Sequence, residues 1–292
     1  MDKTNVMSLF DGGSCGQLAL QRSGINIGKY YASEIDGNCV LITQKHFPET
    51  VQLGNVTQIN FNRFKGQVDL LIGGSPCQGF SQGGKRLNFE DERSRLFFRF
   101  VDALKEIQPK YFLLENVKMN KDCESQISQM LGVTATKINS NLFSAQDRAR
   151  LYWTNIPIPR NFPKNNQVVK DILEVGEIEQ SNYISTERVI YWDEYQTKRK
   201  LGFIGSDNQS ARIYNPAFKS GTLCAEGGGM GAKTGLYLIN NQIRTLTPLE
   251  CERLQTLPDN YTQGLTRNQR YRMINNGWTV NLIAFLFSGI LK

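Results

Sequence analysis

Short apolar runs alternate with helical patterns through the first half of the chain, and this alternation constrains the fold more than any other feature. The apolar runs are rich in branched, aromatic or leucine residues, which is typical of buried strands. They occupy residues 5–10, 29–34, 68–72 and 110–115, and the helical patterns occupy residues 17–23, 39–47 and 94–107. Strands that alternate with helices predict βαβ units, and therefore a doubly wound α/β fold with a mostly parallel sheet.

The composition changes near residue 160 and predicts three regions. Residues 1–159 carry the βαβ pattern, and residues 160–243, rich in Asn, Gln, Gly and charge, predict a second, smaller domain. Within that domain, residues 171–194 hold seven acidic residues and one basic, whereas residues 195–233 hold six basic and two acidic. The basic half is the better candidate for contacting a partner, although a solvated face is the alternative. Residues 244–292 contain two helical patterns that we expect to return to the first domain.

The bulk properties of the 292-residue chain indicate an intracellular protein with a polyanionic partner. The formal net charge is +7 and the pI is about 9.0. The six cysteines include no Cys-x-x-Cys pair, which argues against a zinc knuckle or a disulfide framework and favours reduced thiols. No stretch approaches the ~20 apolar residues of a membrane span, and no signal peptide is recognisable.

A cysteine follows the third predicted strand on a loop rich in glycine, with the sequence Gly73-Gly74-Ser75-Pro76-Cys77-Gln78-Gly79-Phe80-Ser81. Parallel sheets bind their ligands outside the carboxyl ends of the strands, so Cys77 is a candidate nucleophile. The alternative is a buried thiol, because free cysteine usually packs in the core. The one histidine, His46, is distant in the sequence, which argues against a Cys–His hydrolase.

A turn containing glycines follows the first predicted strand, and an acidic residue ends the second. The turn is Phe10 to Gly16 and the acid is Glu34. This is the nucleotide-binding arrangement of doubly wound folds, in which the carboxylate accepts from ribose hydroxyls. The turn lacks Gly-x-Gly-x-x-Gly spacing, which favours a ligand without a pyrophosphate. A solvated strand end is the alternative for Glu34.

Seven motifs, taken together and in order, resemble the DNA cytosine-5 methyltransferase family over nearly the whole chain. They are Phe10-Asp11-Gly12 to Gly16, Glu34, Gly54-Asn55-Val56, Pro76-Cys77-Gln78, Glu115-Asn116-Val117, Gln146-Asp147-Arg148-Ala149-Arg150 and Arg244 to Cys251. Any one of them is a weak match, whereas seven in the family's order are specific. The wording Ser-Leu-Phe-Asp-Gly and Trp278 are closest to the animal de novo branch, while the absence of a regulatory N-terminal domain resembles a bacterial or phage enzyme.

The resemblance implies transfer of a methyl group from S-adenosylmethionine to C5 of a cytosine in double-stranded DNA. The Cys77 thiolate would add to C6, Glu115 would hydrogen-bond N3 and the amino edge, and Arg150 would donate to O2. Arg148 belongs to the same implied catalytic set. The target base must leave the duplex to reach the nucleophile. For Glu115 and Arg150 a structural ion pair is the alternative.

The resemblance also implies the binding residues and the partners. The expected cofactor residues are Phe10, Asp11, Gly12, Gly13, Ser14, Cys15, Gly16, Glu34, Ile35, Asn55, Val56, Pro76, Trp278 and Val280. The expected DNA contacts are Gln78, Ser81, Lys85, Arg86, Arg212, Thr222, Leu223 and Gly228. No metal is expected. We further expect a monomeric enzyme in the cytoplasm of a bacterial or phage-infected cell, associated with the nucleoid.

Two rival functions follow from the same residues. One branch of the family methylates tRNA, but the Cys-Phe-Thr segment that marks this branch is absent here. A catalytically inactive DNA-binding scaffold is disfavoured, because Cys77, Glu115, Arg148 and Arg150 are all present.

The chain also departs from the common family pattern in places. Ser14 and Cys15 replace glycines, Asn55 replaces an aspartate, and residues 275–280 read Asn-Asn-Gly-Trp-Thr-Val where most members read Gly-Asn-Ser/Ala-Val. We expect these changes to affect cofactor affinity more than catalysis.

Overall fold

The computed structural model describes residues 3–75, 92–185, 187–192, 198–208, 210–225 and 229–291. The chain forms two compact units, each built from more than one segment. The first contains Met1–Asn139, Ala149–Asn161 and Val280–Lys292, and the second contains Ser140–Arg148 and Phe162–Thr279. This division differs from the expected border at residue 244, because the chain between that residue and Thr279 belongs to the second unit.

The first unit is built on a seven-stranded sheet with the order β3-β2-β1-β4-β5-β7-β6. Its strands are β1 Thr4–Leu9, β2 Ile27–Ser33, β3 Val51–Gln52, β4 Leu70–Gly73, β5 Tyr111–Val117, β6 Thr136–Asn139 and β7 Ala149–Thr154. The first five strands are mutually parallel, and β7 runs antiparallel to both β5 and β6. The predicted mostly parallel sheet is confirmed.

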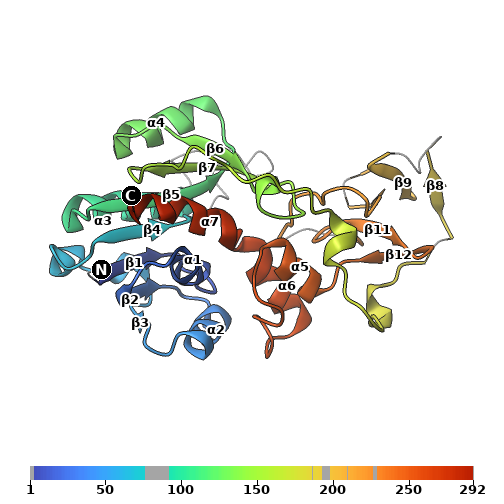
Figure 1. Cartoon of the computed structure of the whole chain (residues 1–292), viewed down its shortest axis with the longest axis horizontal. Coiled ribbons are helices and arrows are strands. Elements are labelled where there is room, and N and C mark those ends of the chain that lie inside the picture. Colours follow the sequence, from blue (N-terminus) through green and yellow to red (C-terminus); the bar gives the residue numbers. More distant parts are fainter. Residues whose placement is uncertain are drawn as a thin grey trace. The chain divides into compact units, whose positions relative to one another are not determined.

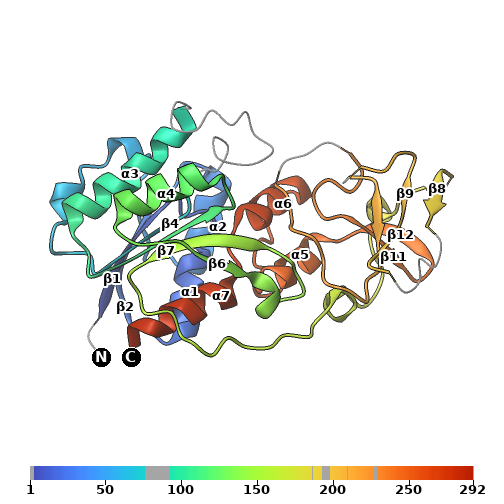
Figure 2. The ribbon, with the colours of Figure 1, turned by 90° about the horizontal axis from the view of Figure 1, so that it is seen from above.

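Helices cover both faces of this sheet. They are α1 Cys15–Ser23, α2 Gly37–His46, α3 Glu92–Ile107, α4 Lys121–Leu131 and α7 Val280–Phe287, with 3-10 turns at Val56–Gln58, Phe61–Phe64 and Ser288–Leu291. Figure 2 shows α3 and α4 over one face and α1 and α7 over the other. The helix α7 packs against α1 although the two are at opposite ends of the chain (Figure 1). This is the doubly wound arrangement that the alternation predicts.

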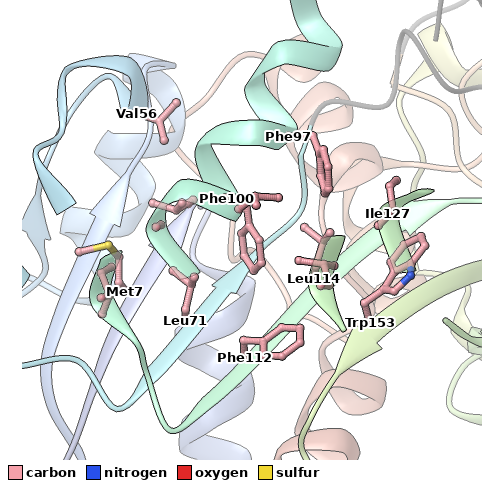
Figure 3. Packing of buried hydrophobic residues seen from close by; sticks show 14 of the residues in the cluster. Met7, Val56, Leu71, Phe97, Phe100, Phe112, Leu114, Ile127 and Trp153 are labelled. Atoms are coloured by element: carbon pink, nitrogen blue, oxygen red, sulfur yellow. The ribbon is translucent and has the colours of Figure 1, made fainter. Parts of the chain in front are cut away.

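The main apolar core lies between α3, α4 and the sheet (Figure 3). Phe97 and Phe100 of α3 contribute fully buried rings to the cluster that also contains Met7, Leu71 and Leu114 from three neighbouring strands. Burial of side chains of this size stabilises a protein by about 1.5–3 kcal/mol each. The core therefore holds the carboxyl ends of β1, β4 and β5 in fixed register.

The register places three loops at one edge of the sheet. Leu9 at the end of β1 is paired with Ser33 on β2 and with Gly73 on β4. Because the three strands are parallel and end together, the segments that begin at Phe10, Glu34 and Gly74 leave from the same edge. Two of these segments carry the expected cofactor residues and the third leads to Cys77.

The second unit contains a five-stranded sheet with the order β12-β11-β10-β9-β8. Its strands are β8 Val189–Tyr191, β9 Lys200–Ile204, β10 Arg212–Tyr214, β11 Leu236–Ile239 and β12 Gln242–Thr245. Its helices are α5 Pro248–Leu254 and α6 Arg267–Asn276, with 3-10 turns at Ser140–Leu142, Val169–Ile172 and Gln180–Asn182. A small apolar cluster formed by Leu201, Ile204, Ile213, Leu236 and Ile243 supports the sheet.

Arg267–Leu291 is long and apolar enough, by length and composition alone, to cross a membrane. The structure divides this stretch into α6, α7 and a final 3-10 turn, with the chain between Gly277 and Thr279 outside any helix. Half of its most apolar window is buried within the protein. Packing in the protein core therefore accounts for its apolar character.

Candidate active site

The loop after β1 adopts left-handed backbone conformations at three positions. Phe10, Gly12 and Ser14 have φ values of 60°, 60° and 56°. Such values are uncommon for residues other than glycine, and they often occur where a loop is shaped for a ligand. Ser14 is the N-cap of α1, and the segment from Gly13 through Gly16 is buried. The loop thus holds a fixed shape at the carboxyl edge of the sheet, where α/β proteins bind nucleotides.

Asp11 is held in this loop by neighbouring hydroxyl groups. Tyr30 donates from its hydroxyl to Oδ1 at 2.7 Å, and Ser14 donates to Oδ2. Burial raises the pKa of Asp11 to about 6, and the nearby Glu34 carboxylate adds to the rise, while the hydroxyl donors oppose it. The carboxyl group therefore changes charge within a pH range that is accessible to experiment.

Glu34 joins the end of β2 to the loop after β1. One carboxylate oxygen accepts from the backbone N–H of Gly12 at 2.8 Å, and the other accepts from Ile35 at 2.7 Å and Asp36 at 2.8 Å. A carboxylate oxygen can accept about two hydrogen bonds, so the oxygen that is bonded only to Gly12 retains capacity for a ligand hydroxyl. The position of Glu34 in the sequence is enough to predict it as a site residue, and the structure adds its bond to the loop after β1.

The other expected cofactor residues on this edge differ in exposure. Ile35 is 77% exposed, which is unusual for a large apolar side chain beside a charged group. Asn55 is also exposed, but its Oδ1 accepts from the Thr57 N–H at 3.0 Å and from the Thr57 hydroxyl at 2.9 Å. Val56 is buried in the apolar core. If the Asn55 oxygen also accepts from an adenine amino group, as expected, it must do so while it accepts from Thr57.

The segment that leads to the predicted nucleophile is anchored by Asn116. Its Nδ2 donates to the Ser75 carbonyl oxygen at 3.3 Å and to the Ser75 hydroxyl at 3.1 Å, and both residues are buried. Asn116 is not among the site residues expected from the sequence, although its place in the Glu115-Asn116-Val117 motif was a signal. Ser75 ends the first described range. The residues predicted in the next segment, Pro76, Cys77, Gln78, Ser81, Lys85 and Arg86, lie outside the described residues.

Glu115 on β5 and Arg150 on β7 form an ion pair. Arg150 Nε lies 3.1 Å from Glu115 Oε1, and the two side chains are only 13% and 12% exposed. The antiparallel register brings them together, because Val117 pairs with Arg150. Arg150 also donates from Nη1 to the Ala149 carbonyl oxygen at 2.9 Å. The ion pair leaves guanidinium donors for other acceptors, so it is compatible with a role in catalysis.

Arg148 has different partners from Arg150, although only Ala149 separates them. Its Nη1 donates to the Leu223 carbonyl oxygen at 3.2 Å, and its Nη2 donates to the carbonyl oxygens of Asn275 at 3.0 Å and Gly277 at 3.1 Å. The residue is 5% exposed. Through these bonds Arg148 holds backbone segments of the second unit together. Its expected catalytic role stays a prediction.

The expected DNA contacts in the second unit occupy contrasting environments. Arg212 on β10 pairs with Asp207 at 2.6 Å, and this hydrogen bond raises the pKa of the guanidinium. Thr222 is exposed and its hydroxyl donates to the Asp147 carbonyl oxygen at 2.7 Å. Leu223 is 2% exposed, so its side chain packs in the interior and does not offer a surface to DNA. Gly228 lies outside the described residues.

The two expected cofactor residues near the C-terminus fall on either side of the division between the units. Trp278 ends the second unit together with Thr279, and Val280 begins α7 in the first unit. Val280 is fully buried. It therefore packs within the first unit, and its expected cofactor role stays a prediction.

A cavity of about 390 Å³ in the second unit is separate from these residues. Its lining is mixed, and the charged side chains in it include Glu174, Glu177, Arg267 and Arg270. Arg270 forms an ion pair with the fully buried Glu252 at 3.0 Å. None of the expected site residues lines this cavity, so it does not define the active site.

The family model for C-5 cytosine-specific DNA methylases matches residues 4–292. The chain belongs to this family. It is 30% identical to the type II methyltransferase M.HhaI of Haemophilus parahaemolyticus over 305 residues, which cover 96% of this chain and 92% of the relative. It is 29% identical to the type II methyltransferase M.Eco47II of Escherichia coli, over 95% of this chain and 76% of that protein.

Solved structures agree with the fold of this cytosine-5 DNA methylase. The Entamoeba histolytica methyltransferase EhMeth superposes with a TM-score of 0.78 at 19% identity, over 100% of this chain and 98% of that chain. The fold is the Rossmann-like one of methyltransferases that use S-adenosylmethionine, which is the methyl donor of this family. The predictions of family, fold class, activity and cofactor are thereby confirmed.

Three of the described thiols of the methylase are poor competitors for the role of nucleophile. The thiolate is the reactive form, and burial raises the pKa of Cys39, Cys123 and Cys251. These three cysteines therefore remain protonated at neutral pH. Within the described part of the chain, no group of three or more His, Cys, Asp or Glu side chains is placed to hold a metal ion.

Proposed function

We propose that this DNA cytosine-5 methyltransferase works through Cys77, Glu115 and Arg150 acting on a cytosine flipped out of duplex DNA. The ion pair of Glu115 and Arg150, close to the anchored Ser75, is the observation that carries the proposal. Cys77 follows Ser75 by two residues, so the nucleophile begins from the edge of the sheet that also presents the carboxylate. The three groups supply a nucleophile, a carboxylate and a hydrogen-bond donor to one planar ring.

The chemistry requires each of these groups. The Cys77 thiolate forms a bond to C6, which makes C5 nucleophilic enough to accept a methyl group. Glu115 hydrogen-bonds N3 and the amino group, and Arg150 donates to O2, where negative charge develops. Loss of the C5 proton then expels the thiolate and restores the aromatic ring. The Arg150 guanidinium keeps Glu115 oriented before the base arrives.

The proposed cofactor site lies between the loop after β1 and the end of β2. S-adenosylmethionine supplies an electrophilic methyl group when it is bound. Glu34 would accept hydrogen bonds from its ribose hydroxyls, and exposed Ile35 would cover one face of the adenine. The Glu34 carboxylate fits this role as a hydrogen-bond acceptor, because three backbone N–H groups already fix it and it needs no rearrangement.

DNA recognition is proposed for the basic half of the second unit, residues 195–233. Exposed Thr222 and partly exposed Arg212 are its best described candidates for touching DNA. The acidic partner of Arg212, Asp207, would have to yield to a phosphate. We assign Leu223 to the packing of this segment, in place of the DNA contact expected from the sequence, because its side chain is buried. Double-stranded DNA remains the proposed substrate, with a monomeric enzyme in the bacterial cytoplasm.

The mechanism is tested by Cys77→Ala. Methyl transfer should be lost, while binding of S-adenosylmethionine and DNA should remain. DNA containing 5-fluorocytosine should trap the parent enzyme covalently, because fluorine at C5 blocks the elimination step, and it should not trap the variant. Cys123→Ala, which removes a thiol buried in the apolar core, is the matched control and should keep methyl-transfer activity. Turnover by Cys77→Ala would overturn the mechanism.

The nature of the nucleic acid is tested separately with labelled S-adenosylmethionine. Duplex DNA should be labelled in preference to tRNA under identical conditions. Preferential labelling of tRNA would replace DNA as the proposed substrate without affecting the roles of Cys77 and Glu115.

A further inference from the structure

Asn275 binds both described ends of a segment in the proposed recognition region. It lies in the last turn of α6 and is 2% exposed. Its Nδ2 donates to the Cys224 carbonyl oxygen at 2.8 Å and to the Lys233 carbonyl oxygen at 3.2 Å. The Cys224 N–H also donates to the Lys233 carbonyl oxygen at 3.1 Å. One side chain therefore holds together two pieces of chain, residues 221–225 and 229–235.

The orientation of the Asn275 amide is determined by its neighbours. Two carbonyl oxygens face it, so the amino group and not the oxygen must point toward them. Its Oδ1 is buried and accepts no hydrogen bond from the described residues. A buried acceptor without a partner costs free energy. The two bonds that Nδ2 donates must offset this cost, so they are the main contribution of the side chain.

The backbone of Asn275 is itself anchored. Arg148 donates to its carbonyl oxygen at 3.0 Å and to that of Gly277 at 3.1 Å, and the same guanidinium donates to Leu223. Gln255 donates to the carbonyl oxygens of Ile274 at 3.0 Å and Gly277 at 2.9 Å. The end of α6 is thus a fixed base from which Asn275 reaches the recognition segment.

Residues immediately before Cys224 are fastened to the same base. The Leu223 N–H donates to Gln146 Oε1 at 3.4 Å, and the Thr222 hydroxyl donates to the Asp147 carbonyl oxygen. The exposed Thr222 consequently has little freedom to move. A displacement at Cys224 would be passed to Thr222 through one buried residue, Leu223.

We propose that Asn275 is a positioning residue for DNA sequence specificity, because it sets the geometry of residues 221–225 and 229–235. This proposal rests on the proposed function of residues 195–233 in DNA recognition. Asn275 is one of the residues at which the chain departs from the family pattern, and from the sequence we expected those departures to affect cofactor affinity. The proposal gives Asn275 a role in DNA recognition instead. Loss of the two donated bonds should alter which DNA sites are methylated and leave the cofactor site intact.

The substitution Asn275→Asp tests the proposal with almost no change of shape. It removes both donors and places carboxylate oxygen against two carbonyl oxygens. Asn276→Asp is the matched control, because it makes the same change at the next residue, which is exposed. The parent enzyme is first expressed in a host lacking cytosine methylation, and its target sequence is mapped by bisulfite sequencing.

The readouts are the ratio of methylation rates at the mapped site and at single-mismatch sites, and the Kd for S-adenosylmethionine from calorimetry. We expect Asn275→Asp to lower the ratio about tenfold, equivalent to about 1.4 kcal/mol, with the cofactor Kd unchanged. Asn276→Asp should match the parent in both. An unchanged ratio would overturn the proposal, and so would a cofactor Kd that weakens in step with the ratio.

Asn275→Ala provides a milder variant in case the aspartate does not fold. It removes the donors without adding repulsion and should lower the ratio less. If neither variant binds cofactor, Asn275 supports the fold as a whole and the positioning role is wrong. If the parent methylates DNA without sequence preference, the proposed recognition function fails independently of Asn275.

Discussion

Glu34 accepts one hydrogen bond from the loop after β1 and two from the turn that follows it, and its loss should damage the proposed cofactor binding in two ways. Glu34→Ala removes the expected ribose contacts and also frees the Gly12 N–H. Hydrogen bonds to charged groups contribute about 1.5–3 kcal/mol, so the Kd for S-adenosylmethionine should rise at least about tenfold. Asn55→Ala should have a smaller effect, because that side chain is neutral and its oxygen already caps Thr57. Calorimetric titration measures both, and an unchanged Kd for Glu34→Ala would place the cofactor elsewhere.

Asp11 should make stability depend on pH in an unusual direction. Its pKa is about 6 in the folded protein, against 3.8 for the unperturbed group. Between these values the folded state holds the proton more tightly, so stability falls as pH rises through this window and the loss is complete above pH 6. The pKa difference corresponds to at most about 3 kcal/mol in the free energy of unfolding, and Asp11→Asn should abolish this pH-dependent loss. Urea unfolding at pH 5 and pH 7.5 measures the difference.

The control for this pH effect is Asp122→Asn, an exposed residue in the first turn of α4. It should keep the pH dependence of the parent. If Asp11→Asn loses as much stability as the parent between the two pH values, the raised pKa is not the cause.

At the level of elements, the sequence predicts the first unit well where the signal is local. The four expected strands are present as β1, β2, β4 and β5, and the helices between them lie within a few residues of their expected bounds. Apolar runs and helical stripes are local patterns, so one sequence is sufficient to find them. The antiparallel β6 and β7 were not expected as strands, because their pairing is decided by contacts distant in the sequence.

The site was predictable where a motif carries it and less so where register or packing does. The sequence includes Glu115 and Arg150 in separate motifs, but only the pairing of β5 with β7 brings them within 3.1 Å. Arg148 looks equivalent to Arg150 in the sequence, yet it precedes β7 and bonds to backbone of the second unit. Asn275 stood out in the sequence only as a departure from the family pattern. Its contacts with residues 224 and 233 could not be predicted, because its partners are carbonyl oxygens that any residue type supplies.

An exchange of the proposed recognition residues should leave the strands of the second sheet unchanged. Residues 195–233 include β9 and β10, which are interior strands of that sheet, so exchanging the whole segment risks unfolding it. Exchanging only residues 221–233 for those of a methylase with another target should redirect methylation while sparing cofactor binding. A base-edge contact of good geometry gives about 1–3 kcal/mol of discrimination. Bisulfite sequencing decides, and retention of the original target would disprove the recognition assignment.

The first unit as a whole depends on the last residues of the chain. Five side chains of α7, namely Val280, Leu282, Ile283, Leu286 and Phe287, are at most 1% exposed, and the helix packs on α1. Near its end, a Cβ added to Gly289 would lie only 2.0 Å from the Pro157 carbonyl oxygen. At about 1.5–3 kcal/mol per side chain, this burial rivals the ~5–15 kcal/mol by which whole proteins are stable. The cofactor site is therefore expected to need both ends of the chain.

A truncated chain tests this dependence directly. Residues 1–161 alone should aggregate or fail to bind S-adenosylmethionine, because the apolar face of α1 that α7 covers would be exposed to water. The same residues joined by a flexible Gly/Ser linker to residues 278–292 should regain cofactor binding, since the fusion restores all three segments of the first unit and keeps Trp278. A fusion carrying Leu282→Asp and Leu286→Asp is the control and should behave like the truncated chain. Folding is measured by circular dichroism melting and cofactor binding by calorimetric titration. If residues 1–161 bound the cofactor without α7, the first unit would not require its C-terminal helix.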